Sequence, residues 1–203
     1  MNNKITWILL LLCACAPGSQ LPQASHYDFP NPVDTSTRPV TLQDRQIYQA
    51  GSVNARNDFA GARLNGFEYS ESQYRALIQP ENSPINPSPW FAFKLWSEQL
   101  QSIELVLDYE DYRHRYTPKL STDGAQWSQL AQDRLRLNSD STEAIISLDV
   151  GPDTLWVSAQ EIWATPQVRE WALQLKKVGP VQIDTIGYSK GNRPMLELSL
   201  IHI

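Results

Sequence analysis

One short segment has the residue types and spacing of a hydrolase nucleophile. Residues Gly187-Tyr188-Ser189-Lys190-Gly191 match the G-x-S-x-G pattern, in which a serine stands on a strained turn between a strand and a helix. That fold also needs an acid and a histidine later in the chain, and only His202 follows. Moreover, Asn192-Arg193-Pro194 leads into a strand pattern and not into a helix. The segment therefore predicts a tight glycine turn between two strands.

Metal-assisted hydrolysis would need two or three histidine or carboxylate ligands that converge from fixed spacings. The chain has three histidines, His26, His114 and His202, and none has a His or Glu at metal-ligand spacing. We expect all three to face solvent. The carboxylates Asp108 and Glu110-Asp111 could act as acid and base in a cleft, but the sequence predicts solvated loop charges.

Aromatic residues cluster between Trp90 and Trp96 and could fill a core or line a ligand groove. Because alternate strand positions point to opposite faces, Phe91 and Phe93 share one face, and Trp90 and Trp96 the other. Core filling is the default prediction, and a carbohydrate-binding groove is the open alternative.

Short strands must position these residues. Alternating or apolar runs separated by turn residues predict an antiparallel β-sandwich over residues 45–160. Asp123-Gly124 is a strong turn signal. The apolar face of residues 103–107 changes midway, which predicts a strand covered on both sides. The expected strands are 46–53, 62–69, 74–79, 90–97, 102–107, 114–121, 144–150 and 155–159.

A helix is predicted after the strands. Thr165 is a suitable N-cap, Pro166 suits the first turn, and Gly179 closes the helix after two lysines. Residues 181–186 and 194–200 then read as two strands. This change in pattern predicts a domain boundary near residues 159–165.

The first residues have the pattern of an export signal. Residues 1–15 combine Lys4 with a short apolar core that is too short to span a bilayer, which takes ~20 residues. Their end resembles a bacterial lipoprotein cleavage site, so we expect Cys15 to be lipidated and the protein to be exported and anchored to the bacterial envelope. Residues 16–44 contain five prolines among polar residues and predict a tether.

Composition narrows the classes of partner. The net charge of −5 gives no electrostatic reason to expect a nucleic acid partner. Both cysteines lie at the signal junction, so the mature chain has no disulfide and no thiolate metal site.

Two stretches resemble the zinc metallocarboxypeptidase family, of the carboxypeptidase A type, and in particular bacterial relatives of the cytosolic carboxypeptidases. One resembles their β-sandwich domain and the other the start of their catalytic domain. The first comprises Asn57-Asp58-Phe59-Ala60-Gly61-Ala62-Arg63-Leu64, residues 78–82 and 88–94, and residues 116–124 with Trp127. The second is Ile186-Gly187-Tyr188-Ser189-Lys190-Gly191-Asn192-Arg193-Pro194-Met195, in which Asn192 replaces the usual glycine before the arginine.

The resemblance implies a peptidase that releases C-terminal residues from peptides or proteins through a zinc-bound water in the full-length parent. The metal-binding His-x-x-Glu pair, the later histidine and the catalytic glutamate of that family match no residue of this chain, so we assign it no catalytic, cofactor-binding or metal-binding residue. Gly187, Ser189 and Arg193 are expected to serve the turn. The fold expected is mainly β: an antiparallel sandwich followed by the truncated beginning, one helix and two strands, of an α/β carboxypeptidase domain over residues 161–203.

Two functional hypotheses follow. In the first, the chain is the N-terminal fragment of an exported zinc metallocarboxypeptidase and is catalytically incomplete by itself. Its last six residues, 198–203, resemble the product of a sequencing-library transposon end, and our hypothesis is that they are not native. In the second, the chain is a lipid-anchored β-sandwich that binds glycan or cell-wall material.

Overall fold

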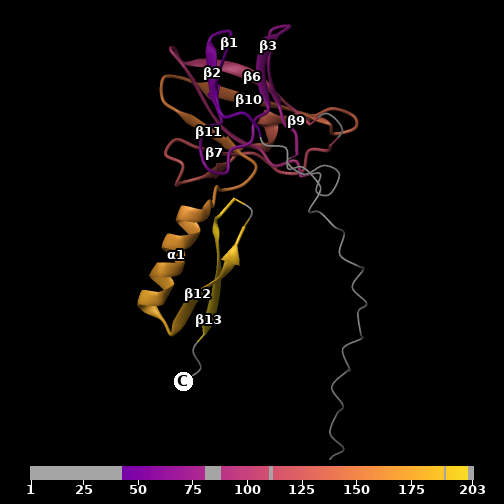
Figure 1. The fold of residues 1–203 in the computed structure, drawn as a ribbon. Helices are drawn as coiled ribbons and strands as arrows, with labels where there is room; N and C mark the ends of the chain where they lie inside the picture. The colour runs from indigo at the N-terminus through magenta and orange to yellow at the C-terminus, as the bar shows by residue number, and fades with distance from the viewer. Residues whose placement is uncertain (1–42, 81–87, 110–111, 190, 201–203) are drawn as a thin grey trace, which may run out of the picture. The chain divides into compact units, whose positions relative to one another are not determined.

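A computed structural model describes residues 43–80, 88–109, 112–189 and 191–200. These residues belong to one compact unit, Pro39–Ile203, and they are mainly β, as predicted (Figure 1). The predicted signal peptide with Cys15, nearly all of the tether, His26 and His202 lie outside the described residues. Within the described ranges, no helix has both the length and the apolar character needed to cross a membrane.

The first sheet is antiparallel throughout and mixes strands from distant parts of the chain. Its order is β1-β2-β5-β11-β7-β8. The strands are β1 (Ile47–Ala50), β2 (Val53–Arg56), β5 (Ala92–Ser97), β11 (Leu155–Ser158), β7 (Lys119–Ser121) and β8 (Ser128–Gln129).

The second sheet has the order β3-β4-β6-β10-β9. Its strands are β3 (Gly66–Ser70), β4 (Gln73–Leu77), β6 (Gln101–Asp108), β10 (Glu143–Val150) and β9 (Leu135–Leu137), which follows a short 3-10 turn at Gln132–Arg134. The pairs are antiparallel except that of β4 with β6, which is parallel.

Side chains from both sheets meet in one hydrophobic core, which makes the arrangement a sandwich. Phe93 and Leu95 of the first sheet and Leu105 and Ile146 of the second are fully buried. Alternation along each strand directs these side chains inward. Val106 is buried as well as Leu105, so β6 is covered on both sides, as predicted.

Several predicted strand limits were wrong. The expected strand 46–53 is a hairpin of β1 and β2, because Gly51 takes a φ of +54° and reverses the chain. The expected strand 62–69 begins at Gly66, and only residues 119–121 of the expected strand 114–121 are extended. The short strands β8 and β9 were not predicted.

The final elements are α1 (Thr165–Val178), β12 (Val181–Tyr188) and β13 (Pro194–Leu200), and the two strands form an antiparallel hairpin. Thr165 is the first helical residue and not the N-cap; Ala164 holds the cap position without a side-chain hydrogen bond. Gly179 ends the helix, as predicted, with its N–H donated to the carbonyl of Leu175.

This helix and hairpin leave much apolar surface uncovered. Only Ala172 of α1 is fully buried. On the hairpin, Ile186, Tyr188 and Leu200 are 65%, 63% and 70% exposed. A two-stranded hairpin alone is marginally stable at best, and among the described residues of this helix and hairpin only Ala172 is fully buried.

Candidate functional site

Ser189 lies in the turn between β12 and β13 and has structural contacts only. Its N–H donates to the carbonyl of Arg193 at 2.9 Å, and the N–H of Arg193 donates back to the Ser189 Oγ at 3.1 Å. Asn192 has a φ of +55°, and asparagine adopts this left-handed conformation more readily than other non-glycine residues. A strand and not a helix follows, so the predicted turn between two strands is confirmed, but Asn192 and not a glycine holds its left-handed position.

The prediction that His114 faces solvent was wrong. Its ring contacts Tyr109, whose hydroxyl lies 2.9 Å from the His114 Nδ1, and its Nε2 is buried without a hydrogen-bond partner in the described part of the chain. Burial lowers the pKa of His114, and burial raises the pKa of Tyr109 well above its usual range. His114 therefore packs against Tyr109 of the core, and its burial favours the neutral form of the ring.

Asp108 is also more structured than a solvated loop charge. It ends β6 and accepts a hydrogen bond from the Arg75 Nη1 at 2.7 Å, and the same nitrogen reaches the Glu143 Oε1 at 2.6 Å. The pKa of Arg75 is raised, first by the hydrogen bond with Glu143 and against the effect of burial. Glu110 and Asp111 lie outside the described residues.

The described residues do not fit a zinc ion. Within the described ranges, no group of three or more His, Cys, Asp or Glu side chains could hold a metal. We therefore derive no catalytic step through zinc for this chain.

The aromatic cluster fills the core, as the default interpretation predicted. Phe91 and Phe93 are fully buried. Trp90 is half-buried and donates its indole N–H to the Gly61 carbonyl at 2.9 Å. Trp127 packs edge-on against Trp156, with an interplanar angle of 77°. Such a pair is not coplanar, so it provides no flat stacking platform for a sugar.

The segment 57–64, on which the family resemblance rests, determines local structure. Asn57 is buried, and its Nδ2 donates to the carbonyls of Leu64 at 2.7 Å and Asp44 at 2.8 Å. Its Oδ1 accepts the N–H of Gln46 at 2.8 Å. This single side chain thus joins the entry to β1 with the connection between β2 and β3, a role that sequence patterns alone did not reveal.

The first sheet carries a cation–π contact between a lysine and two aromatic rings, which was not predicted from the sequence. The Lys94 Nζ lies 3.7 Å from the Trp156 ring centroid and 4.9 Å from that of Phe59. Burial is the main cause that lowers the pKa of Lys94, and the positive charge of Arg56 adds to it. Strand pairing could have suggested this contact, since Lys94 lies opposite Trp156 in the register of β5 and β11.

The predicted Asp123-Gly124 turn is confirmed and packs against the same tryptophan. The Asp123 Oδ1 accepts the N–H groups of Ala125 and Gln126, both at 2.8 Å. These two hydrogen bonds, with that of Gln126 the stronger influence, lower the pKa of Asp123. Gly124 has a φ of +74° and lies so close to the Trp156 ring that a Cβ would be 2.8 Å from its Cζ2.

The described residues thus bring together no nucleophile, base and metal. The contacts of the segments that resemble the family position strands, turns and one tryptophan.

The fold is shared with bacterial metallo-carboxypeptidases. One is a metallo-carboxypeptidase from Burkholderia cenocepacia, with a TM-score of 0.59 and 12% identity over 73% of this chain and 40% of that one. Another is a metallo-carboxypeptidase from Pseudomonas aeruginosa in complex with (2-guanidinoethylmercapto)succinic acid, with a TM-score of 0.55 and 16% identity over 71% of this chain and 39% of that one. The chain therefore spans about two-fifths of the length of these proteins. No protein-family model and no curated protein matches the sequence.

Proposed function

We propose that this chain is the N-terminal part of an exported zinc metallocarboxypeptidase, which hydrolyses C-terminal residues from peptides or proteins. The observation that carries the proposal is the fold shared with the Burkholderia and Pseudomonas enzymes over more than two thirds of this chain and about two-fifths of theirs. The named activity of those enzymes, together with the resemblance of residues 186–195 to the start of a catalytic domain, favours this function.

The uncovered apolar surface of the last elements supports the same proposal. Trp171, Ile186 and Tyr188 are 43%, 65% and 63% exposed. Side chains of this kind are normally covered, and further strands and helices of a peptidase domain would cover them. Residues 161–203 are then the beginning of that domain, and residues 45–160 are the accessory sandwich.

The zinc ligands of the proposed enzyme are not among the described residues, and we place them in the remainder of the parent protein. The chain alone is expected to release no amino acid from a peptide. Its part in the enzyme is to supply the accessory domain and to hold the peptidase at the envelope through a tether, residues 16–44, and a lipid on Cys15.

Reading the genomic DNA beyond codon 197 tests the proposal. We expect an in-frame continuation that contains a His-x-x-Glu pair soon after the β12–β13 hairpin. A long in-frame continuation without such a pair would remove the basis for a zinc carboxypeptidase.

The lipid anchor has its own test. Cells expressing the chain are labelled with palmitate, and the label should enter the protein and disappear in Cys15→Ser. Equal labelling of both proteins would refute lipidation at Cys15 while leaving the peptidase proposal intact.

A further inference from the structure

A polar groove lies where three turns of the sandwich meet, away from the segments that resemble the peptidase family. We call it the turn groove. It consists of two adjacent depressions of 460 Å³ and 370 Å³, each within the range of roughly 300–1,000 Å³ that small-molecule sites occupy. Ser52 and Gln101 line both depressions, so the two form one continuous surface.

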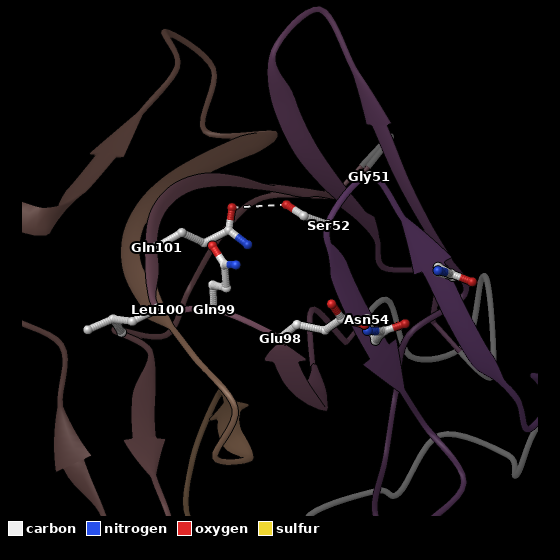
Figure 2. A pocket seen from close by; sticks show the side chains of 8 residues that line it. Gly51, Ser52, Asn54, Glu98, Gln99, Leu100 and Gln101 are labelled. Carbon is white, nitrogen blue, oxygen red and sulfur yellow. Dashed lines mark hydrogen bonds between the residues drawn. The ribbon is translucent and has the colours of Figure 1, made fainter.

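Ser52 forms contacts that link the three turns. It stands in the β1–β2 turn, and its Oγ donates to the Gln101 Oε1 at 3.0 Å, at the end of the β5–β6 turn (Figure 2). The same hydroxyl lies 3.1 Å from the hydroxyl of Tyr74, on the β3–β4 hairpin. These hydrogen bonds join the three turns that form the groove.

The larger depression is lined by amides. Gln49, Asn54 and Gln99 carry side chains with both donor and acceptor atoms, and Glu98 adds an acceptor. Figure 2 shows Gln99 and Gln101 directed into the space in front of Ser52, whereas Leu100 points away. An amide can accept from one hydroxyl and donate to the next, which matches neighbouring hydroxyls on a polyol.

The smaller depression adds an aromatic surface. Tyr69 is 48% exposed, and its ring packs against Tyr74 with centroids 4.6 Å apart. Gly51 permits this packing, because a Cβ there would lie 3.2 Å from the Tyr69 ring. The β3–β4 turn below it uses two non-glycine residues at positive φ, Glu71 at 51° and Ser72 at 66°. Positive φ at both central residues is the geometry that a two-residue hairpin turn of type I′ requires.

The side chains that line the groove disfavour anionic ligands and apolar ligands. The lining of both depressions contains no Lys, Arg or His, so phosphate and carboxylate ligands find no cationic partner. Glu104, the second carboxylate of the lining, is already paired with Arg136. The polar character of the lining disfavours an apolar ligand, because such ligands bind in mostly hydrophobic pockets.

We propose that the turn groove binds an uncharged oligosaccharide, with the amides of Gln49, Asn54 and Gln99 recognising hydroxyls and the Tyr69 ring stacking on a sugar face. The two depressions, which share Ser52 and Gln101, offer room for more than one sugar unit. This function is independent of peptidase activity and would direct the protein to glycan material.

The test titrates the full chain with chitohexaose, cellohexaose and maltohexaose, and with a pool of random peptides, by calorimetry. We expect at least one oligosaccharide to bind with a Kd in roughly the micromolar to millimolar range. Gln49→Ala/Gln99→Ala should weaken that binding roughly tenfold, since two hydrogen bonds are lost. The matched control, Gln129→Ala/Gln132→Ala, removes two exposed glutamines outside the groove and should bind as the parent does.

Two further measurements test the same site if the double variant folds poorly. Tyr69→Phe keeps the ring and should bind normally, whereas Tyr69→Ala should bind more weakly. In the unmodified chain, the side-chain NH₂ resonances of Gln49, Asn54 and Gln99 should shift when the oligosaccharide is added. The proposal is overturned if no oligosaccharide binds, if only the peptides bind, or if binding persists without any change in these resonances.

Discussion

Gly124 provides a direct test of how the sandwich positions Trp156, because two separate costs arise when it gains a side chain. Its φ of +74° is left-handed, which costs an L-residue roughly 1–2 kcal/mol. A new Cβ would also stand 2.8 Å from the Cζ2 and 2.9 Å from the Cε2 of Trp156, and a rigid indole cannot yield locally.

The net magnitude for Gly124→Ala follows from these terms. Alanine reduces the conformational entropy of the unfolded chain, which stabilises the folded protein by roughly 0.4–1 kcal/mol. Displacing Trp156 also weakens its contact with Lys94, which is worth about 0.5–1 kcal/mol at an exposed site. We therefore expect Gly124→Ala to lower the free energy of unfolding by roughly 0.5–2.5 kcal/mol, and by more where the overlap with the indole is not relieved.

Urea denaturation followed by tryptophan fluorescence measures this loss. Gly179→Ala is the matched control, because its φ is not left-handed and a Cβ there would meet nothing closer than 3.9 Å. That control should raise the free energy of unfolding by roughly 0.4–1 kcal/mol, because only the loss of chain entropy in the unfolded state acts there. If both variants had the same stability as the parent, the account of the Gly124–Trp156 contact would be wrong.

Two further predictions concern the second sheet and the residues beside it. Arg75→Met should lower the free energy of unfolding by roughly 1–2 kcal/mol, allowing for solvent screening, because it leaves Asp108 and Glu143 facing each other on paired strands. Urea titrations in low and high salt should show a smaller loss in high salt, and a loss independent of salt would contradict an ionic cause. Burial lowers the pKa of His114 in the folded state, so folding favours the neutral ring. The stability that the neutral ring contributes is therefore complete above the unfolded pKa of ~6.5. This stability is lost as the pH falls toward the lower folded pKa. The free energy of unfolding, measured by urea titration, should therefore fall more between pH 7.5 and pH 5.5 in the parent than in His114→Gln, a variant that keeps a partner for Tyr109. An equal fall in both proteins would refute this linkage.

Local chemistry predicted those parts of the fold that depend on near neighbours. The Asp123-Gly124 turn, the inward pair Phe91 and Phe93, and the end of α1 at Gly179 all follow from residue types a few positions apart. The hairpin at Gly51 was missed because the apolar alternation of β1 continues through it, and one glycine does not distinguish a turn from an irregular strand.

Contacts between distant segments could not be predicted in this way. The parallel pairing of β4 with β6 joins residues about thirty positions apart, as in Tyr74 with Leu105. His114 was expected to face solvent because its neighbours are charged, yet it packs on Tyr109. The turn groove is formed by three separate turns, each of which reads as an ordinary polar loop in the sequence.

The most direct test of the central claim is the release of C-terminal amino acids by the product of the complete gene. Mass spectrometry of a peptide mixture should show successive loss of C-terminal residues by that protein, inhibition by a zinc chelator, and no loss with residues 1–203 alone. A complete, folded gene product that leaves every peptide intact in the presence of zinc would contradict the proposal that this chain is part of a metallocarboxypeptidase.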